Sequence, residues 1–337
     1  MNVKIYDLLV IGAGPAGISQ VVEARAKGIS ADKILVLEKA PEHSWVLRTI
    51  YPDNKLVTAN YKGSDAICHG RMCMPDVSKN EIISYLDKAI KNSAVEVKYK
   101  SEVQKVEAIG TPEHPLFKVK EGENIYYSKV VSIAIGVFGR PNKPLYKLPP
   151  LLSKKIKYDV NSFKEIDGAN ILVVGGGDTA SEYCQFLEEK GNNVTLSYRQ
   201  NSFKRMNDIN RNSILAMAQR KKLTIFWNSN VEEVKISADN NPLVVFAEDE
   251  YGEQEFDYIV YALGGTTPKN FLKSAKIPFN GNSPIIDDNG ESSIKGLYLS
   301  GDLSVDAGKG SIIGAFNNAN NTMTSMCKKY LECSMEA

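Results

Sequence analysis

Two short glycine-rich segments have the residue types and the spacing that hold the phosphates of a dinucleotide. Residues 12–17 read GAGPAG and follow G-x-G-x-x-G, whereas residues 175–180 read GGGDTA and follow G-x-G-x-x-A. In such a turn the first glycine permits a tight bend and the second lets the backbone approach a pyrophosphate. The third small residue lets the next helix pack closely on the strand. That helix then directs free N–H groups and its positive dipole end at the phosphates.

Different residues stand where each site would bind the adenosine ribose. Glu38 follows the first motif, and a carboxylate there accepts hydrogen bonds from both ribose hydroxyls and repels a 2′-phosphate. Tyr198 and Arg199 follow the second motif, with Lys204 shortly after. Because a charged hydrogen bond contributes about 1.5–3 kcal/mol, two cations would favour NADPH over NADH by a factor of about 100 or more. The alternative is that Arg199 and Lys204 are solvated surface charges.

Each glycine turn lies between segments that would position it. An apolar strand is expected before each turn, a helix after it, and a second short strand beyond the helix, so both form βαβ units with parallel strands and right-handed crossovers. In the first unit these are residues 3–11, 16–28 and 34–37, and in the second they are residues 171–174, 178–190 and 194–198.

The remaining segments indicate how two domains share the chain. Residues 95–135 and 223–263 are rich in strand-forming residues, residues 139–150 read as a linker, and a helix at 311–331 returns to complete the first domain. We predict an α/β fold with two Rossmann-like, three-layer ββα dinucleotide-binding domains, the second inserted into the first. Residues 1–146 and 264–337 are expected to bind FAD, and residues 147–263 to bind NADPH.

Composition excludes several classes of protein. The chain has 337 residues, enough for two domains, and a net charge of +1, which argues against a nucleic-acid or membrane surface. No apolar run approaches the roughly 18–20 residues of a membrane span, and the N-terminus runs directly into a strand, so a cytoplasmic protein is expected. Five cysteines are too few and too scattered for a disulfide scaffold.

The two motifs, in this order and spacing, resemble those of the two-domain pyridine nucleotide flavoprotein reductases typified by low-molecular-weight thioredoxin reductase. The resemblance covers nearly the whole chain. Residues 133–136 and 261–265 resemble the segments that leave the two domains, and residues 198–204 resemble the family's H-R-R-x-x-x-R phosphate clamp with several basic positions changed. Gly301-Asp302 resembles the G-D motif whose aspartate holds the ribityl chain of FAD. Residues 310–312 would then open a helix towards the flavin pyrimidine.

The sequence departs from thioredoxin reductases in one respect, which restricts the resemblance to part of this family. Thioredoxin reductases carry C-x-x-C in the second domain, but here residues 74–183 contain no cysteine and Cys184 stands alone. The chain therefore resembles the related NADPH reductases of flavodoxin, ferredoxin or quinones, and residues 136–144 are most similar to the flavodoxin:quinone reductase branch. The resemblance also implies a homodimer.

This resemblance implies that NADPH reduces the flavin at N5 and that the flavin then passes electrons to flavodoxin, ferredoxin or a quinone. No side-chain catalyst and no metal are expected, and Trp45, Tyr51 or Tyr330 would stack on the flavin. The residues expected to bind FAD are Gly12, Gly14, Pro15, Ala16, Gly17, Glu38, Lys39, Ser44, Trp45, Val103, Gly136, Gly301, Asp302, Gly310, Ser311 and Ile312. The residues expected to bind NADPH are Gly175, Gly177, Asp178, Thr179, Ala180, Tyr198, Arg199 and Lys204.

Two alternatives stay open. Cys68 and Cys73 have the C-x4-C spacing of a redox disulfide, which would make the chain an NADPH-dependent disulfide reductase. The last two hundred residues lack the histidine that would protonate a thiolate leaving group, so we expect free thiols instead. The second alternative is a module that binds FAD and NADPH without turnover.

Other enzyme classes have less support in the sequence. Ala16 argues against a reductase with a cysteine inside its first glycine motif, and residues 139–165 lack the fingerprint of a flavin monooxygenase, which Trp45 and residues 51–52 faintly resemble. His43, His69 and His114 share no metal-ligand spacing and form no Ser/His/Asp pattern.

Overall fold

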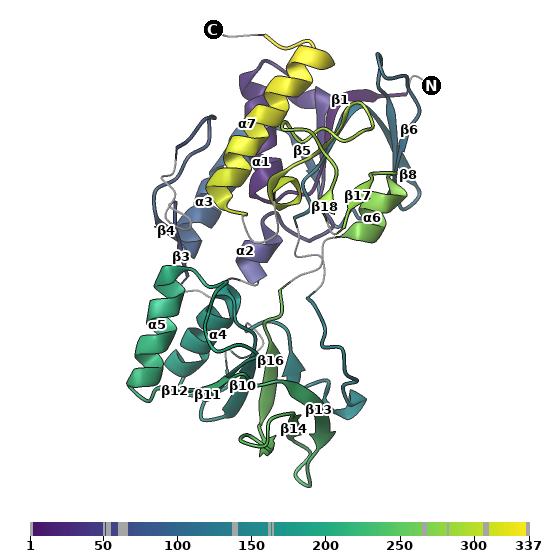
Figure 1. The fold of residues 1–337 in the computed structure, drawn as a ribbon. Helices are drawn as coiled ribbons and strands as arrows, with labels where there is room; N and C mark the ends of the chain where they lie inside the picture. Colours follow the sequence, from purple (N-terminus) through teal and green to yellow (C-terminus); the bar gives the residue numbers. More distant parts are fainter. Residues whose placement is uncertain are drawn as a thin grey trace. The chain divides into compact units, whose positions relative to one another are not determined.

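The chain divides into two compact units. The computed structural model (Figure 1) describes residues 3–49, 51, 55–59, 67–136, 141–160, 163, 165–264, 268–281, 283–305 and 310–334. The first unit comprises Met1–Arg48, Leu56–Gly139 and Thr267–Ala337, and the second comprises Thr49–Lys55 and Arg140–Thr266. The second unit is thus inserted into the first, and the short segment Thr49–Lys55, which the sequence did not indicate, also joins it.

The first unit is built on a sheet that has seven strands among the described residues, in the order β5-β2-β1-β8-β7-β6, with β19 also paired to β8. Its parallel strands are β1 (Ile5–Ile11), β2 (Ile34–Leu37), β5 (Glu96–Lys98), β8 (Asn124–Ile133) and β19 (Leu297–Leu299). Two antiparallel strands, β6 (Val103–Ala108) and β7 (Phe117–Glu121), extend it. The strand β1 is central, since Leu8 pairs with both Ile34 and Val130.

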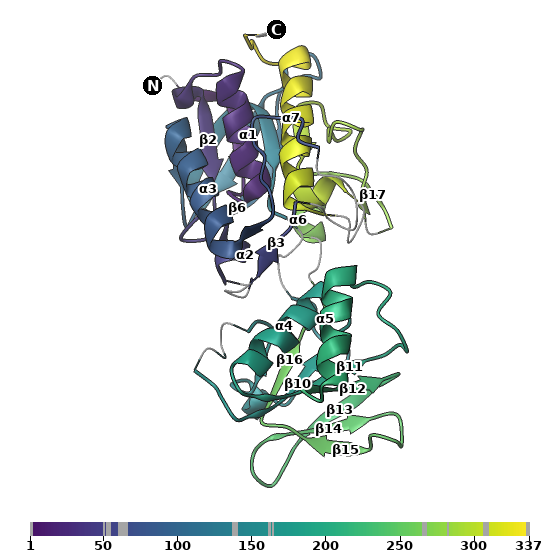
Figure 2. The ribbon, with the colours of Figure 1, turned by 90° about the vertical axis from the view of Figure 1, so that its left-hand side faces the viewer.

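Three helices cover one face of this sheet. Figure 2 shows α1 (Pro15–Ala26) between α3 (Lys79–Ser93) and α7 (Ile312–Lys329). Alternation along β1 sends Leu8 and Val10 into the core beneath these helices, whereas Leu9 and Ile11 face a second core that includes α6 (Lys269–Ser274). The sheet therefore separates two apolar layers, as a three-layer fold requires.

Shorter elements complete the first unit. The helix α3 begins with a capping box in which Ser78 and Glu81 satisfy each other's backbone N–H groups. The remaining elements are the helices η1 (Ala31–Lys33), α2 (Trp45–Thr49) and η4 (Gly301–Ser304), and the strands β3 (Leu56–Val57), β4 (Val77–Ser78), β17 (Phe279–Asn280) and β18 (Ser283–Pro284).

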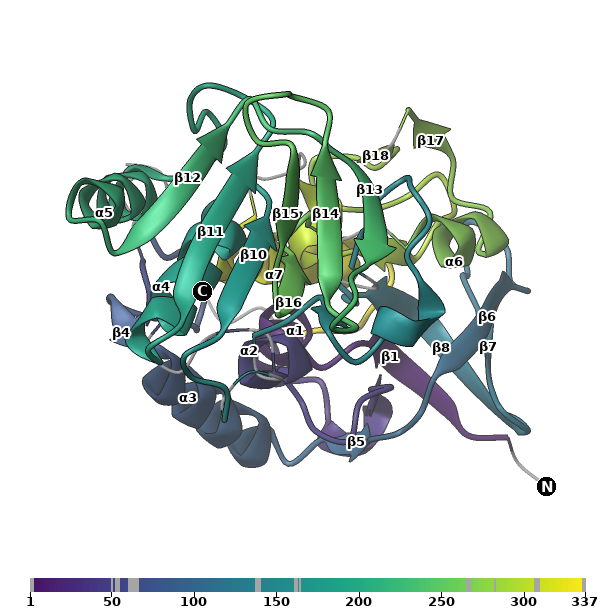
Figure 3. The same ribbon diagram turned by 90° about the horizontal axis from the view of Figure 1, so that it is seen from below.

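The second unit repeats the three-layer plan. Its parallel sheet (Figure 3) has the order β12-β11-β10-β16-β9, made of β9 (Ile156–Lys157), β10 (Asn170–Val174), β11 (Asn193–Tyr198), β12 (Leu223–Trp227) and β16 (Tyr258–Tyr261). Ile171 and Val173 share a core with α4 (Asp178–Glu189) and α5 (Asp208–Gln219), whereas Leu172 shares one with an antiparallel sheet. That sheet consists of β13 (Val231–Ile236), β14 (Pro242–Phe246) and β15 (Glu253–Glu255), and η2 (Pro150–Leu152) precedes the unit's strands.

The predicted fold class is confirmed. Both βαβ units form with parallel strands, and the helix expected at 311–331 is α7, which packs beside α1 in the first unit. The ends of the predicted helices differ from the observed ones by one or two residues, which is the usual fraying of a helix end. Most of the linker expected at 139–150 is described, but residues 137–140 lie outside the described ranges. Among the described helices none is long and apolar enough to cross a membrane.

Candidate dinucleotide-binding sites

The first glycine turn is shaped by two close backbone approaches and one open space. A Cβ on Gly12 would lie 2.6 Å from the carbonyl oxygen of Ala134, and a Cβ on Gly17 would lie 2.0 Å from the carbonyl oxygen of Gly12. A Cβ on Gly14, by contrast, would meet no atom within 4 Å. Backbone atoms therefore crowd the turn at Gly12 and Gly17, whereas the space beside Gly14 is open.

The helix that follows this turn presents an uncapped N-terminus. Gly14 is the N-cap of α1, Pro15 occupies the first turn, no side chain caps the helix and no acidic residue lies in its first turn. The first N–H groups of a helix have no partner within the helix, so they are available to a phosphate in the open space before Gly14. This geometry fits the pyrophosphate of a dinucleotide.

The carboxylate of Glu38 is fixed beside the turn. Its Oε2 accepts a hydrogen bond from the N–H of Ala13 at 2.7 Å, and its Oε1 accepts one from the N–H of Ala40 at 2.8 Å. A carboxylate has about four acceptor positions, so each oxygen keeps one for a ribose hydroxyl. Ser44 is close by, because its N–H donates to the carbonyl of Ala13 at 2.8 Å. Of the other residues expected here, Lys39 is exposed.

The segment before α7 lies next to the first glycine turn. Gly301 has a φ of +69°, and a Cβ on it would lie 2.8 Å from the Cβ of Ala16. Its N–H donates to Oδ1 of Asn318 on α7 at 3.1 Å. The structure thus brings the expected G-D motif, the first glycine helix and the last helix together within one unit, although they are far apart in sequence.

Asp302 stands at the junction of these elements. Burial raises the pKa of its carboxyl group, and within the described ranges this carboxyl has no hydrogen-bond or ion-pair partner. Gly310 lies directly against it, and Ser311 caps α7 by accepting a hydrogen bond from the N–H of Gly314 at 2.9 Å. No acidic residue lies in the first turn of α7, which Ile312 opens. A desolvated carboxyl without a partner fits an acceptor of ligand hydroxyl groups.

Three other expected FAD residues differ in what they can offer. Gly136 has a φ of +63° with open space where a Cβ would lie, so a ligand can approach its backbone. Val103 is buried in the core on the α6 side of the sheet, so its side chain serves packing. Trp45 is 41% exposed at the start of α2.

The other two aromatic candidates have partners elsewhere. The hydroxyl of Tyr330 donates to Oε1 of Glu291 at 2.5 Å, at the far end of α7 from Ser311. Tyr51 belongs to the second unit, where the Lys55 ammonium lies 4.2 Å from its ring centroid. Trp45, the third candidate, belongs to the first unit and lies at the start of α2.

The second glycine turn has the same plan with one difference. A Cβ on Gly175 would lie 2.5 Å from the carbonyl oxygen of Ala262, whereas a Cβ on Gly177 would meet nothing within 4 Å. Gly177 is the N-cap of α4, and no side chain caps that helix. Ala180 is fully buried against the strand, and Thr179 is partly exposed. Asp178 is tied to α5, because its Oδ1 accepts a hydrogen bond from the N–H of Asn207 at 2.7 Å.

The residues of the expected phosphate clamp separate into two groups. Tyr198 is buried, its ring stacks on Phe203 with centroids 5.1 Å apart, and a Cβ on Gly176 would lie 1.9 Å from its Cε2. Its ring therefore packs against the turn. Arg199 and Lys204 are both exposed, and neither forms an ion pair within the described part of the chain. They remain the two cations available to a 2′-phosphate.

Sequence reasoning missed a polar cluster next to the first turn. Nδ1 of His43 lies 3.1 Å from Oγ of Ser44, Nε2 of His43 lies 2.6 Å from Oδ1 of Asp87, and Arg48 donates to the same oxygen at 2.6 Å. This is a Ser/His/Asp arrangement, which the spacing did not reveal because Asp87 comes from α3. Ser44 is only 2% exposed, so the cluster anchors the segment after Glu38 and offers no nucleophile to solvent.

The expectation of free thiols at Cys68 and Cys73 is wrong. The two residues form a disulfide with Cα atoms 5.7 Å apart, and Cys327 and Cys333 form another with Cα atoms 5.4 Å apart. Cys184 is a free thiol, fully buried, and burial raises its pKa. Both disulfides join residues five or six positions apart, so they depend on the local course of the chain, which spacing alone does not define. Within the described ranges no three histidine, cysteine or acidic side chains gather to hold a metal.

Comparison with known proteins gives a consistent picture. A family model described as pyridine nucleotide-disulphide oxidoreductase matches residues 9–301. A protein named ferredoxin–NADP reductase from Ignicoccus hospitalis is 28% identical over 302 residues, covering 88% of this chain and 90% of its own. Ferredoxin–NADP reductase 2 from Shouchella clausii is 24% identical over 335 residues, covering 97% and 94%.

Solved structures with the same fold include two reductases. Bacillithiol disulfide reductase from Staphylococcus aureus superposes with a TM-score of 0.80 at 20% identity, covering 97% of this chain and 100% of its own. Thioredoxin reductase from Lactococcus lactis gives a TM-score of 0.75 at 22% identity, covering 96% and 98%. At this level of identity the likeness establishes the fold only.

Proposed function

Because the chain belongs to the pyridine nucleotide-disulphide oxidoreductase family, we propose that it is an FAD-dependent NADPH oxidoreductase that reduces ferredoxin or flavodoxin. The observation that carries this proposal is the pairing of two dinucleotide turns with opposite charges at the ribose position. Glu38 stands at the first turn, and the exposed cations Arg199 and Lys204 follow the second. The names of the related proteins from Ignicoccus hospitalis and Shouchella clausii support the choice of acceptor.

In this proposal the first unit binds FAD. The uncapped start of α1 holds the pyrophosphate, Glu38 accepts the adenosine ribose hydroxyls, and Asp302 accepts hydroxyls of the ribityl chain. The start of α7 at Ser311 would offer its positive dipole end to negative charge on a bound flavin. The chemistry that FAD supplies when bound is the uptake of an electron pair and its release singly or together.

The second unit binds NADPH. The uncapped start of α4 behind Gly177 holds its pyrophosphate, and Arg199 and Lys204 neutralise the 2′-phosphate. The buried ring of Tyr198 supports the turn through its contact with Gly176. The protein thus contributes positioning and electrostatics.

The second unit lacks a C-x-x-C motif, and this excludes one route to an acceptor. Its single cysteine in sequence is Cys184, which is buried and free, so no C-x-x-C there can pass electrons to thioredoxin. A one-electron carrier protein or a quinone is therefore the acceptor class that the proposal assigns to this chain. The expected homodimer and cytoplasmic location are part of the proposal, and light scattering on the purified chain tests the first.

The test is an anaerobic titration of the oxidised protein, purified with its flavin, with NADPH and separately with NADH. We expect the flavin band to bleach completely at one equivalent of NADPH, and the reduced protein to reduce added ferredoxin or flavodoxin. A requirement for two equivalents would assign a second two-electron centre and favour the disulfide reductase. A chain without flavin, or one that neither nucleotide reduces, would leave a binding module.

A further inference from the structure

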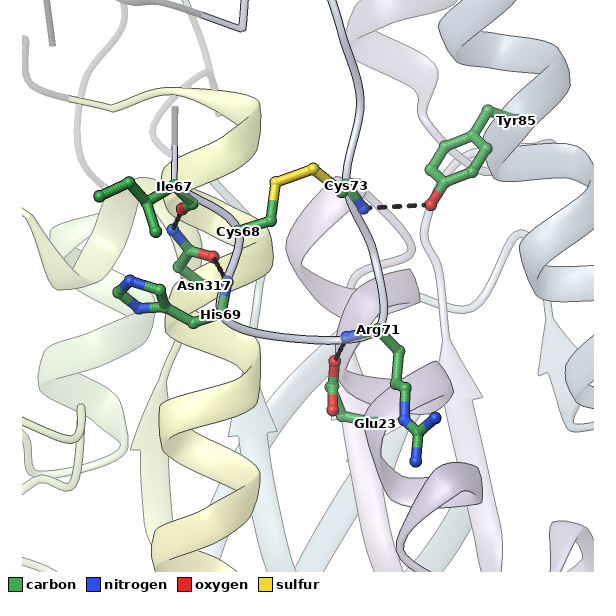
Figure 4. Close-up of a disulfide and its surroundings, with 8 residues drawn as sticks. All are labelled: Glu23, Ile67, Cys68, His69, Arg71, Cys73, Tyr85 and Asn317. Carbon is green, nitrogen blue, oxygen red and sulfur yellow. Dashed lines mark hydrogen bonds between the residues drawn. A yellow bond between two sulfur atoms is a disulfide. The ribbon is translucent and has the colours of Figure 1, made fainter. Parts of the chain in front are cut away.

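A disulfide-closed loop, residues 67–74, crosses α1 and α7 in the first unit, and we call it the strap. Figure 4 shows the Cys68–Cys73 bond closing this loop over the two helices. None of the residues proposed to bind FAD or NADPH belongs to it. Its disulfide therefore needs a separate explanation.

Side chains of α7 hold the first half of the strap by its backbone. Nδ2 of Asn317 donates to the carbonyl of Ile67 at 2.6 Å, and its Oδ1 accepts from the N–H of His69 at 2.8 Å (Figure 4). Nδ2 of Asn320 donates to the carbonyl of His69 at 3.2 Å. One asparagine thus pairs with the strap as a neighbouring strand would.

The second half of the strap is held by α1 and α3. The N–H of Arg71 donates to Oε1 of the buried Glu23 at 2.5 Å, and the N–H of Cys73 donates to the hydroxyl of Tyr85 at 3.2 Å (Figure 4). Met72 and Met74 are buried and anchor this end. The strap therefore bonds to the two helices whose N-termini carry the first glycine turn and Ser311.

A cavity borders the middle of the strap. A cavity of about 240 Å³ is bounded by His69, Gly70 and Arg71 on the strap and by residues of α1, α7 and the C-terminal segment, among them Glu23, Lys27, Asn320 and Thr324. Beside this cavity Gly70 lies close to both helices, because a Cβ on it would lie 2.4 Å from Oε1 of Glu23 and 2.9 Å from Cβ of Asn320. The strap is thus held by the contacts of Gly70, by the hydrogen bonds described above and by the disulfide.

The disulfide itself is open to attack from solvent. Cys73 is exposed and Cys68 is partly exposed, whereas the free thiol of Cys184 is fully buried. The bond closes a loop of only five residues' separation, so it constrains the unfolded chain less than a long-range bridge would.

We propose that Cys68–Cys73 is a thiol-exchange site that is reduced by an external dithiol and not by NADPH through the flavin. Its reduction weakens the hydrogen bonding of the strap to α1 and α7. A thiolate of the dithiol attacks Sγ of Cys73, the more exposed of the two residues, the Cys68–Cys73 bond breaks, and Cys68 leaves as a thiolate. The second thiol of the dithiol then displaces Cys73, so the dithiol becomes a disulfide and the protein gains two thiols, each of which takes up a proton. The reduced strap loses its closure over the cavity and loosens its bonds to Asn317 and Glu23.

The test uses the full chain with its flavin, treated with increasing dithiothreitol and then alkylated for mass spectrometry. We expect Cys68 and Cys73 to become labelled together while Cys184 stays unlabelled. Amide hydrogen exchange over the strap should rise by about tenfold or more, a change well within what a disulfide contributes. The Cys68→Ser/Cys73→Ser variant should show the fast exchange without dithiothreitol.

Two further variants separate the effect of reduction from general destabilisation. Cys327→Ser/Cys333→Ser removes the other disulfide and should leave exchange over the strap slow. Asn317→Ala keeps the Cys68–Cys73 bond but removes two strap hydrogen bonds, so its strap should exchange faster before reduction. The proposal is overturned if Cys68 and Cys73 label without reductant, or if the bond resists dithiothreitol until the protein unfolds. It is also overturned if reduction leaves strap exchange unchanged, or if NADPH alone reduces the bond.

Discussion

Gly310 lies against Asp302 so closely that a Cβ on Gly310 would sit 2.1 Å from Oδ1 of that carboxylate. The residue before α7 therefore has to be small for the carboxyl group to keep its place. The pKa of Asp302 is raised because burial disfavours its charged form. A carboxyl held in a desolvated position, with no partner among the residues that the structure describes, is expected where a ligand will supply one.

Replacing Asp302 should weaken FAD binding without weakening the empty protein. Asp302→Asn removes one charged hydrogen bond, worth about 1.5–3 kcal/mol, so the Kd for FAD should rise roughly 10- to 150-fold. Flavin fluorescence during titration of the apoprotein measures it. The exposed Asp288→Asn is the matched control and should bind as the wild type does. An unchanged Kd in the Asp302 variant would remove this residue from the site.

The same carboxyl gives a pH test in the apoprotein. The pKa of this carboxyl is higher in the folded protein than in the unfolded chain, so its ionisation lowers the free energy of unfolding. This loss of stability grows as the pH rises from the pKa of the unfolded chain towards the pKa of the folded protein. Above both values Asp302→Asn should therefore melt higher than the wild-type apoprotein, whereas at pH 3 the two should melt alike. Thermal denaturation of the apoproteins at pH 3 and pH 7 measures this. A lower melting temperature for the variant at pH 7 contradicts it.

Two glycines of the first turn should respond in opposite ways to the same added methyl group. A Cβ on Gly14 meets nothing within 4 Å, so Gly14→Ala should change the free energy of unfolding of the apoprotein by no more than about 1 kcal/mol while blocking the pyrophosphate. A Cβ on Gly17 would lie 2.0 Å from the Gly12 carbonyl oxygen, so Gly17→Ala should destabilise the apoprotein by about 1–3 kcal/mol. Urea unfolding and FAD titration of each variant measure both effects. Equal loss of stability in the two variants would show that the space at Gly14 is not open.

The parts of the site that could be predicted are those fixed by backbone geometry within a short segment. Gly12, Gly17 and Glu38 could be identified because strand, turn and helix place them whatever the rest of the chain does. The binding role of Tyr198 stays a prediction, but its motif position did not indicate that its ring fills the space left by the missing side chain of Gly176.

The contacts that sequence reasoning missed join segments whose courses depend on other elements. The contact of His43 with Asp87 requires α3 to lie beside the segment after β2. The Cys68–Cys73 bond requires the strap to curve across α1 and α7. Neither course is encoded in the spacing of the residues concerned.

Reversing one exposed charge should alter the choice between the two nicotinamide nucleotides. Arg199→Glu replaces a cation at the end of β11 with an acid, so the KM for NADPH should rise about 10- to 150-fold while the KM for NADH changes little. Steady-state reduction of an artificial acceptor with each nucleotide measures this. Lys154→Glu makes the same charge change at another exposed position of the second unit and should affect neither. Equal effects of Arg199→Glu on both nucleotides would remove Arg199 from the phosphate site.

The end of α7 is held by a buried carboxylate whose effect on stability should depend on pH. Glu291 accepts hydrogen bonds from Nζ of Lys329 at 2.6 Å, from the hydroxyl of Tyr330 at 2.5 Å and from the N–H of Gly296 at 3.0 Å. Burial alone would raise its pKa, but these bonds prevail and lower it. A carboxyl with a lowered folded pKa stabilises the fold above its unfolded value, about 4.3, and this stabilisation is lost as the pH falls through the folded value.

Glu291→Gln should therefore lower the free energy of unfolding at pH 7 by about 1.5–3 kcal/mol, because a neutral amide replaces charged hydrogen bonds. The difference between variant and wild type should shrink as the pH falls below 4, because the wild-type carboxylate is then protonated. Urea unfolding at pH 7, 5 and 3 measures it, and the exposed Glu332→Gln is the control. A difference that stays constant down to pH 3 would mean that packing, and not the charge of Glu291, holds the end of α7.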